Sequence, residues 1–350
     1  MISNSVSSPK QIVCKGRRAK WWLRRGSPKR GFSYWTCDGK QVKDEAALER
    51  IKSLVIPPAW SNVRISPHPS SKLQAIGVDT RGRIQYLYNS KFAEARARHK
   101  FSKIERFGEY LPQLRKVTNE HIALEGFPRE KVLAIMTRLI NSLYIRIGTD
   151  RSVREYRTFG ITTLGNRHVS IKRRGEVVFE FVGKRHIKHR KVIVDEELAS
   201  LLKDLTAIGR GRKLFQYLDE EQRAHPVTPT QINSYIKSIT APEYSAKDFR
   251  TWGATMLAAL ELAELGPAED ERQIKRNIVR VVKSVAEQLG NTPTICRASY
   301  IHPLILKAYE NGITIENFTP RKNRHLRLYE AEFEPAEVSL LEMFRRLGSA

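Results

Sequence analysis

The spacing of apolar residues changes near residue 92, and this change constrains the fold more than any other feature of the sequence. Before it, short β-type runs alternate with turn residues, at 31–35, 63–65, 73–76 and 84–88, and one helix is expected at 45–54. After it, apolar residues recur at helical spacing, at 93–107, 129–147, 196–202 and 230–239. We therefore predict an α+β chain with a β-rich domain over residues 1–92 and a mainly helical domain over residues 93–350.

The helical domain is expected to contain a small sheet. Residues 159–181 are its one β-type stretch, with hairpin turns predicted at Gly165-Asn166 and Arg174-Gly175. A length of 350 residues also favours two domains over one.

The chain is strongly basic. Its 62 Lys and Arg against 37 Asp and Glu give a formal net charge of +25, which predicts a polyanionic partner, nucleic acid first. No apolar run is long enough to span a membrane. Residues 10–30 carry nine basic side chains and no acidic one, interleaved with Trp21 and Trp22. This segment is interpreted as a nucleic-acid-binding arm, with a solvated surface run as the alternative.

The cysteines and the N-terminal residues indicate the cellular compartment in which the protein is expected. Cys14, Cys37 and Cys296 are too few and too scattered for a disulfide framework or a zinc site. Residues 1–9 lack the apolar stretch of a secretory signal. A reduced, cytoplasmic protein is expected.

Arg146 ends an expected helix beside Gly148. A cation there complements the helix dipole, and that role or an ion pair is the simpler explanation. The functional alternative is an arginine that a packed helix holds against a phosphate.

Lys184 follows an apolar strand at 177–182 and precedes the basic run 185–191, so it is expected at a hairpin tip. A turn lysine is usually only solvated. Near a phosphate and other cations, however, an ammonium group can donate a proton to a leaving oxygen.

Lys247 and Arg250 share the first turn of a helix that Ser245 should cap. Two cations at a helix N-terminus are disfavoured by the helix dipole unless an anion joins them. They are interpreted as a second phosphate site.

Tyr300 lies in a segment with clear signals for the end of one helix and the start of the next. Gly290 ends one amphipathic helix, and Thr292 with Pro293 begins another that carries Tyr300 about two turns in. A helical tyrosine is more often a core residue than a nucleophile, because its phenol has a pKa near 10 and needs strong charge stabilisation to attack.

In order along the chain, Arg146, Lys184, the Lys247 to Arg250 cluster and the segment from Asn291 to Tyr300 resemble the active-site series of poxvirus-type and bacterial type IB DNA topoisomerases. The resemblance spans nearly the whole chain. Two weaker similarities lie in the first domain, at 82–88 and at the proline-rich turn 56–60.

The chain departs from the poxviral pattern at two positions. Asn291 stands where poxviral and cellular eukaryotic members have a catalytic histidine, and an asparagine is known from the bacterial branch. Arg185 follows the hairpin lysine, where the poxviral pattern has aspartate, which alters the surroundings of Lys184.

The resemblance implies a fold like that of tyrosine recombinases and type IB topoisomerases. It implies relaxation of supercoiled DNA without ATP, metal or another cofactor, through a transient 3′-phosphotyrosyl link made by Tyr300. The implied phosphate-holding residues are Arg146, Arg250 and Asn291, and Lys184 is the implied proton donor. The expected partner is double-stranded DNA, held in a clamp by a nucleoid-associated monomer whose further DNA contacts are Arg83, Gln85, Tyr86, Tyr88 and Lys247.

Two other functions remain as alternatives. A tyrosine site-specific recombinase shares the fold and the nucleophile, but typically has histidine where this chain has Lys247. A nonenzymatic architectural DNA-binding protein explains the charge and the aromatic residues, although not the ordered Arg, Lys, Arg, Tyr series.

Overall fold

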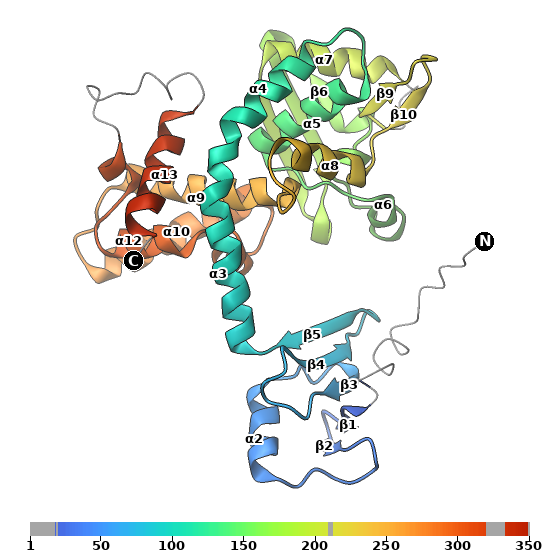
Figure 1. The fold of residues 1–350 in the computed structure, drawn as a ribbon, viewed down its shortest axis with the longest axis vertical. Helices are drawn as coiled ribbons and strands as arrows, with labels where there is room; N and C mark the ends of the chain where they lie inside the picture. The colour runs from blue at the N-terminus through green and yellow to red at the C-terminus, as the bar shows by residue number, and fades with distance from the viewer. Residues whose placement is uncertain (1–17, 19, 209–212, 320–332, 349–350) are drawn as a thin grey trace. The chain divides into compact units, whose positions relative to one another are not determined.

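The computed structural model describes residues 18, 20–208, 213–319 and 333–348 (Figure 1). Contacts within the chain divide it into two units, Met1–Lys100 and Phe101–Ala350. The boundary predicted at residue 92 falls just inside the helix α3 (Ser90–Phe107), which runs from one unit into the other. Each unit is described separately below.

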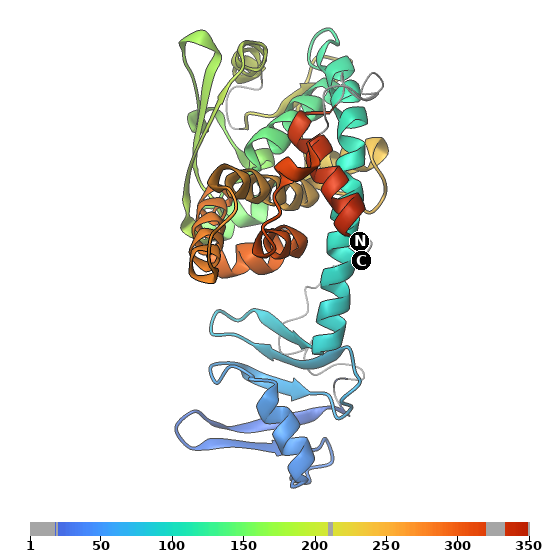
Figure 2. The same ribbon diagram turned by 90° about the vertical axis from the view of Figure 1, so that its left-hand side faces the viewer.

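The first unit is a five-stranded antiparallel sheet with one long helix, α2 (Glu45–Ser53). Its strands, in the spatial order β2-β1-β3-β4-β5, are β1 (Trp22–Ser27), β2 (Gly31–Trp35), β3 (Ser61–Ile65), β4 (Leu73–Val78) and β5 (Ile84–Tyr88). Figure 2 shows α2 crossing one face of the sheet. Ile51 of α2 packs there on Val63, Ile65 and Ala75, because alternate residues of β3 and β4 point to that face. The four predicted strands and the predicted helix are confirmed.

Strand β1 corrects the arm predicted at residues 10–30. Residues 10–17 and 19 lie outside the described residues, but Trp22–Ser27 pairs with both β2 and β3 in the middle of the sheet. Arg24 lies 4.2 Å from the ring centroid of Phe32 and donates a 2.6 Å hydrogen bond to the Trp60 carbonyl. This part of the segment is therefore a strand within the sheet rather than an arm, and Arg24 is held by contacts within the protein.

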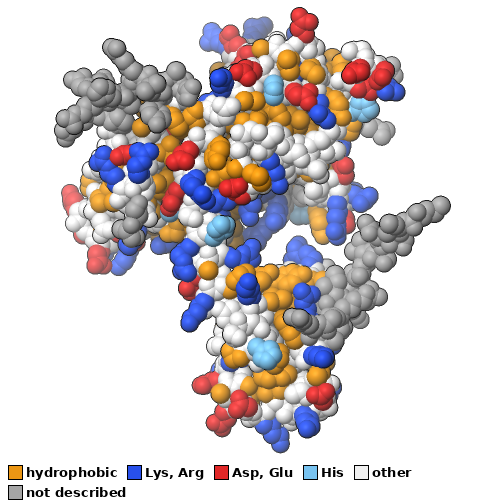
Figure 3. All heavy atoms as spheres, in the orientation of Figure 1, with side chains coloured by type: hydrophobic (Ala, Val, Ile, Leu, Met, Phe, Trp, Pro, Cys, Tyr) orange, Lys and Arg blue, Asp and Glu red, His pale blue; other side chains and the backbone are white. Residues whose placement is uncertain are grey.

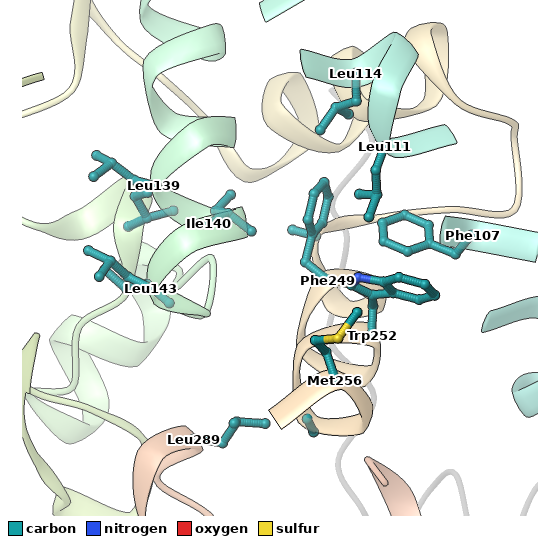
Figure 4. Packing of buried hydrophobic residues seen from close by; sticks show 14 of the residues in the cluster. Phe107, Leu111, Leu114, Leu139, Ile140, Leu143, Phe249, Trp252, Met256 and Leu289 are labelled. Atoms are coloured by element: carbon teal, nitrogen blue, oxygen red, sulfur yellow. The ribbon is translucent and has the colours of Figure 1, made fainter. Parts of the chain in front are cut away.

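The second unit is mainly helical. After α3 its helices are α4 (Leu111–Ile122), α5 (Arg129–Leu143), α6 (Asp150–Tyr156), α7 (Glu196–Ala207), α8 (Pro229–Ile239), α9 (Ala246–Leu265), α10 (Glu271–Leu289), α11 (Pro293–Ser299), α12 (Pro303–Glu310) and α13 (Pro335–Leu347). Helix α9 is buried around most of its circumference, as expected of a central core helix. Figure 4 shows its Phe249, Trp252 and Met256 between side chains of α5 on one side and of α3 and α4 on the other.

The small sheet of this unit differs in part from the prediction. Strands β6 (Val169–Ile171), β7 (Glu176–Val182) and β8 (Lys188–Val194) form an antiparallel sheet, and β9 (Gln216–Leu218) pairs with β10 (Ala224–Pro226). The turn at Arg174-Gly175 is confirmed, but Gly165-Asn166 leads into a 3-10 turn rather than a hairpin. Strand β8 was read only as a basic run, because its outward positions carry Lys188 and Arg190.

Helix α5 ends earlier than predicted. The apolar stripe suggested a helix to residue 147, whereas Tyr144 adopts a left-handed conformation with φ of 53° and ends the helix at Leu143. Arg146 therefore lies beyond the helix, in an extended segment. Its carbonyl accepts a 2.8 Å hydrogen bond from the Ile161 amide, which fixes that segment.

The C-terminal segment is described from residue 333. Helix α13 buries Leu340, Met343 and Phe344 in the core of the second unit, and its Glu337 forms a 2.5 Å ion pair with Arg115 of α4. The C-terminal helix is thus part of the core of the second unit. Residues 320–332 lie outside the described residues.

Lys and Arg side chains gather along α3 on the face shown in Figure 3. Among the residues that the structure describes, no helix is both long enough and apolar enough to cross a membrane.

Candidate active site

Tyr300 ends a short helix whose boundaries the sequence specifies. Gly290 caps α10 in a left-handed conformation with φ of 62°, Thr292 caps α11 through its side chain, and Pro293 takes the first helical position. Tyr300 is the C-cap of α11 rather than a residue inside it, and its amide donates a 2.9 Å hydrogen bond to the Cys296 carbonyl. This places the phenol near the C-terminal end of α10.

Arg250 reaches this point from the first turn of α9. It is only 4% exposed, and its guanidinium group donates to the Tyr144 carbonyl and, at 2.7 Å, to the Leu289 carbonyl. Burial and, after it, the positive charge of Arg146 lower the pKa of Arg250 to about 10. Within the described part of the chain Arg250 has no carboxylate partner, and a buried arginine held only on backbone carbonyls retains its attraction for an external anion.

Arg146 reaches the same carbonyls from the extended segment after α5. Its guanidinium group donates to the carbonyls of Leu289 and Gly290, both at 3.4 Å, and to Oδ1 of Asn291 at 2.5 Å. The C-terminus of α10 therefore holds both arginines, because the carbonyls of a last helical turn have no partner within the helix. The three side chains predicted to hold phosphate lie together.

Two buried donors at this site have no hydrogen-bond partner among the described residues: Nε of Arg250 and Nδ2 of Asn291. Buried polar atoms in proteins are almost always paired, and each unpaired donor costs on the order of 1–3 kcal/mol. An oxyanion is the ligand that fits two such donors beside two guanidinium groups.

The electrostatic surroundings of Tyr300 favour its phenolate. Burial opposes ionisation, but the positive charges of Arg250 and Arg146 outweigh it, aided by a hydrogen bond from Arg250 and by the charge of Lys247. The pKa of Tyr300 therefore lies below its usual value of 10.0. This is the condition that a tyrosine nucleophile requires.

Lys184 lies where the sequence predicted, in the turn between β7 and β8. It lines one concave site together with Arg146 and Arg250. The adjoining Arg185, in a left-handed conformation, adds a positive charge that lowers the pKa of Arg146, after the larger effect of burial. Lys184 is exposed, so an approaching phosphate ester can reach its ammonium group.

Lys247 is exposed in the first turn of α9, beyond the Ser245 cap. The predicted capping box is confirmed, with Oδ2 of Asp248 accepting a 2.8 Å hydrogen bond from the Ser245 amide. Asp248 also forms a 2.8 Å ion pair with Lys103, so the negative charge of Asp248 is balanced within the protein.

The other predicted DNA contacts are Gln85, Tyr86 and Tyr88 on β5, an edge strand of the first unit, and Arg83 immediately before it. Tyr86 and Tyr88 are exposed by 43% and 42%, and their rings stack with centroids 6.3 Å apart. Oδ2 of Asp79 accepts hydrogen bonds from Nε of Arg83 and Nε2 of Gln85, at 2.8 Å and 2.9 Å. An exposed edge with stacked aromatic rings and cations suits a nucleic-acid groove.

Several residues of this site were not predicted. Thr255 of α9 is fully buried, and its Oγ1 lies 3.2 Å from the Tyr300 carbonyl and accepts a 3.1 Å hydrogen bond from the His302 amide. His189 and Lys191 of β8 line the same concave site as Lys184. The period-2 alternation of β8 is the one sequence signal that could have placed them on an inward face.

The comparisons with known proteins agree with this geometry. A profile described as the catalytic core of eukaryotic DNA topoisomerase I matches residues 89–325, and a profile of the N-terminal domain of bacterial DNA topoisomerase IB matches residues 31–79. The DNA topoisomerase 1B of Acanthamoeba polyphaga mimivirus is 30% identical over 299 residues, covering 83% of this chain and 88% of the relative. The DNA topoisomerase 1B of vaccinia virus (strain Copenhagen) is 23% identical over 272 residues, covering 75% and 82%.

Proposed function

The chain belongs to the type IB DNA topoisomerases, and we propose from this that it relaxes supercoiled duplex DNA by cutting one strand transiently through Tyr300. The observation that carries the assignment is the group of one buried and one half-buried arginine and two unpaired donors, among the described residues, around a tyrosine of lowered pKa. The arrangement binds one phosphate and activates one nucleophile beside it.

In the cleavage step, Oη of Tyr300 attacks the scissile phosphorus in line with the 5′ oxygen. A P–O bond to the tyrosine forms, the P–O5′ bond breaks, and the phenolic proton passes to solvent. Lys184 gives its proton to the departing 5′ oxygen, which leaves as a hydroxyl. Arg146, Arg250 and Asn291 hold the nonbridging oxygens while negative charge builds up on them.

Religation is the reverse of this step. One phosphodiester is exchanged for another of similar energy, so no nucleotide is consumed, and torsional strain drives rotation of the cut strand about the intact one. The residues assigned here supply nucleophile, proton donor and oxyanion contacts from the chain itself. We propose that no metal or cofactor takes part.

Binding to the duplex is proposed to involve both units. Lys247 contacts a phosphate near Tyr300, while Arg83 and the β5 residues Gln85, Tyr86 and Tyr88 contact the major groove. A net charge of +25 predicts that affinity falls steeply with salt as counterions are released. We further propose that the protein acts as a monomer on DNA in the cytoplasm.

The test is relaxation of a supercoiled plasmid in EDTA, with the covalent adduct trapped by denaturant. Tyr300→Phe is expected to abolish both the adduct and relaxation while retaining noncovalent binding, because only the attacking oxygen is lost. Relaxation by the Phe variant would refute the assignment of the nucleophile. Recombinant products from paired target sites would instead favour a tyrosine recombinase, although Lys247 stands where recombinases typically have histidine.

A further inference from the structure

Strand β8 presents two polar side chains to the inside of the molecule. Along Lys188–Val194 exposed and half-buried residues alternate, so that His189, Lys191 and Ile193 face inward. Neither His189 nor Lys191 has a part in the reaction as described above. Both nevertheless line the concave site of Arg146, Lys184 and Arg250.

The imidazole of His189 fills the space between two glycines. It stacks on Phe181, its partner across the β7–β8 ladder, with ring centroids 5.1 Å apart. A Cβ on Gly183 would lie 2.6 Å from its Nε2, and a Cβ on Gly290 would collide with its Cε1. Gly183 immediately precedes Lys184, and Gly290 immediately precedes Asn291. The ring is thus wedged between the turn that carries the proton donor and the loop that carries a phosphate contact.

Lys191 makes the second attachment between the same two elements. Its Nζ donates a hydrogen bond to the Gln288 carbonyl in the last turn of α10. The next carbonyls along that turn, of Leu289 and Gly290, are the acceptors of the two arginines. The hairpin and the phosphate-binding guanidinium groups therefore rest on one row of backbone carbonyls.

The charges of the two side chains suit these contacts. Burial, followed by the charge of Lys191, lowers the pKa of His189 to about 4, so at neutral pH its ring is an uncharged spacer. Burial, followed by Arg250 and Arg146, lowers the pKa of Lys191 to about 8. Lys191 thus remains mostly protonated near pH 7 and can donate to the negative end of α10.

On the premise that Lys184 is the proton donor proposed above, we propose that His189 and Lys191 are positioning residues that fasten the β7–β8 hairpin to the C-terminus of α10 and so hold Lys184 at the leaving oxygen. The pairing of β7 with β8 connects the positions of His189 and Lys191 to the position of Lys184. Val182 pairs with Lys188, and the Gly183 amide donates a 2.8 Å hydrogen bond to the Ile187 carbonyl. The turn cannot shift independently of the strand that His189 and Lys191 anchor.

Loss of the contacts of His189 or Lys191 with the end of α10 is expected to slow only the proton transfer from Lys184 to the leaving oxygen. A displacement of about 1 Å at a reacting group can reduce a rate by roughly 10²-fold. That loss should disappear when the leaving group needs no proton. A 5′ sulfur is such a leaving group, because a thiol, with a pKa near 8.5, departs readily as its anion.

The experiment is single-turnover cleavage of two duplexes of the same sequence, one with the natural 5′ oxygen at the scissile bond and one with a 5′-bridging sulfur. Four variants are compared with the parent: His189→Ala, Lys191→Met, Lys191→Arg and Lys184→Ala. The matched control is Val192→Thr, an isosteric change on the outward face of the same strand. Thermal melting checks that each variant is folded, and Lys191→Met carries the test if His189→Ala is unstable.

The proposal predicts that His189→Ala and Lys191→Met cleave the oxygen duplex about 10- to 100-fold more slowly than the parent, yet come within about threefold of it on the sulfur duplex. Lys191→Arg, which keeps a donor for the Gln288 carbonyl, should stay close to the parent on both. Equal losses on both duplexes would show that these residues bind phosphate or support the fold, and no loss on either would show that the hairpin does not depend on them. Either result overturns the proposal.

The premise is tested separately. If the parent forms the covalent adduct but Lys184→Ala is not rescued by sulfur, Lys184 is not the donor and the positioning role falls with it, while the topoisomerase assignment stands. If the parent forms no adduct with either duplex, the proposed function itself fails.

Discussion

The loss of one arginine should be far more damaging than the loss of Asn291, and three alanine variants test this order. Arg250 and Arg146 each bring a full charge and several donors to the oxyanion, whereas Asn291 offers one neutral donor, its Nδ2. Hydrogen bonds from charged donors are about twice as strong as neutral ones. Loss of one preorganised transition-state donor costs about 10²–10³ in rate. We expect a loss near the lower end of this range, about 10²-fold, for Asn291→Ala, and a larger loss, about 10³-fold or more, for Arg146→Ala and Arg250→Ala.

The pH dependence of the cleavage rate is an independent test of the role of Arg250. In the parent, Arg250 is the larger of the two arginine effects that bring the pKa of Tyr300 below 10.0, and burial opposes it. Without Arg250, the effect of burial gains weight and the pKa of Tyr300 rises. Cleavage by Arg250→Ala should therefore keep increasing with pH over a range where cleavage by the parent has levelled. Asn291→Ala removes no charge, so its profile should follow that of the parent.

The measurement is single-turnover cleavage of a short duplex from pH 6 to pH 10, with the adduct trapped by denaturant. Arg250 also holds the carbonyls of Tyr144 and Leu289, so circular dichroism must show that the variant is folded. Arg138→Ala is a matched control, because this arginine of α5 pairs with Asp195 and Glu197. An Asn291→Ala defect larger than those of both arginine variants, or an Arg250→Ala profile that follows the parent, would refute the reasoning.

Three further predictions concern how the site is supported and how it meets DNA. Gly253→Ala should lower the free energy of unfolding by about 1–3 kcal/mol, seen as a lower melting temperature, because a Cβ there collides with the buried Tyr144 ring. Thr255→Val should cost roughly 1–3 kcal/mol in urea unfolding, since it leaves the buried His302 amide without its acceptor; a change below 0.5 kcal/mol would contradict that role. Lys247→Gln should weaken duplex binding and reduce the slope of log affinity against log salt by about 1 if this exposed lysine contacts a phosphate, and an unchanged slope would remove it from the interface.

Local features of the sequence predicted correctly where α10 ends and where α11 begins. Gly290, Thr292 and Pro293 act through their own backbone conformation and hydrogen bonds, so their effect depends little on the rest of the chain. The predicted end of α5 was wrong for the opposite reason. Ile147 continues the apolar stripe, but the helix ends at Leu143, where Tyr144 is left-handed and its ring lies against Gly253 of α9, a contact that depends on the tertiary fold.

The two strands rich in basic residues, β1 and β8, were not predicted from the sequence. Strand β1 carries Arg24 and Arg25, and β8 carries Lys188, Arg190 and Lys191. This density of Lys and Arg suggested a nucleic-acid arm in one case and a basic run in the other. In both strands, the contacts that hold these side chains come from partners distant along the chain. Trp22 and Arg24 lie in the middle of a sheet, and His189 and Lys191 contact the end of α10.

The grouping of the site residues could not be read from the sequence, because the structure that organises them is backbone. The carbonyls of Gln288, Leu289 and Gly290 accept from Lys191, Arg250 and Arg146, which come from three different elements. These acceptors exist because α10 ends there, and any sequence that ends the helix at this place provides them. The left-handed Gly290, with no room for a Cβ beside His189, is thus the residue on which the geometry of the whole site depends.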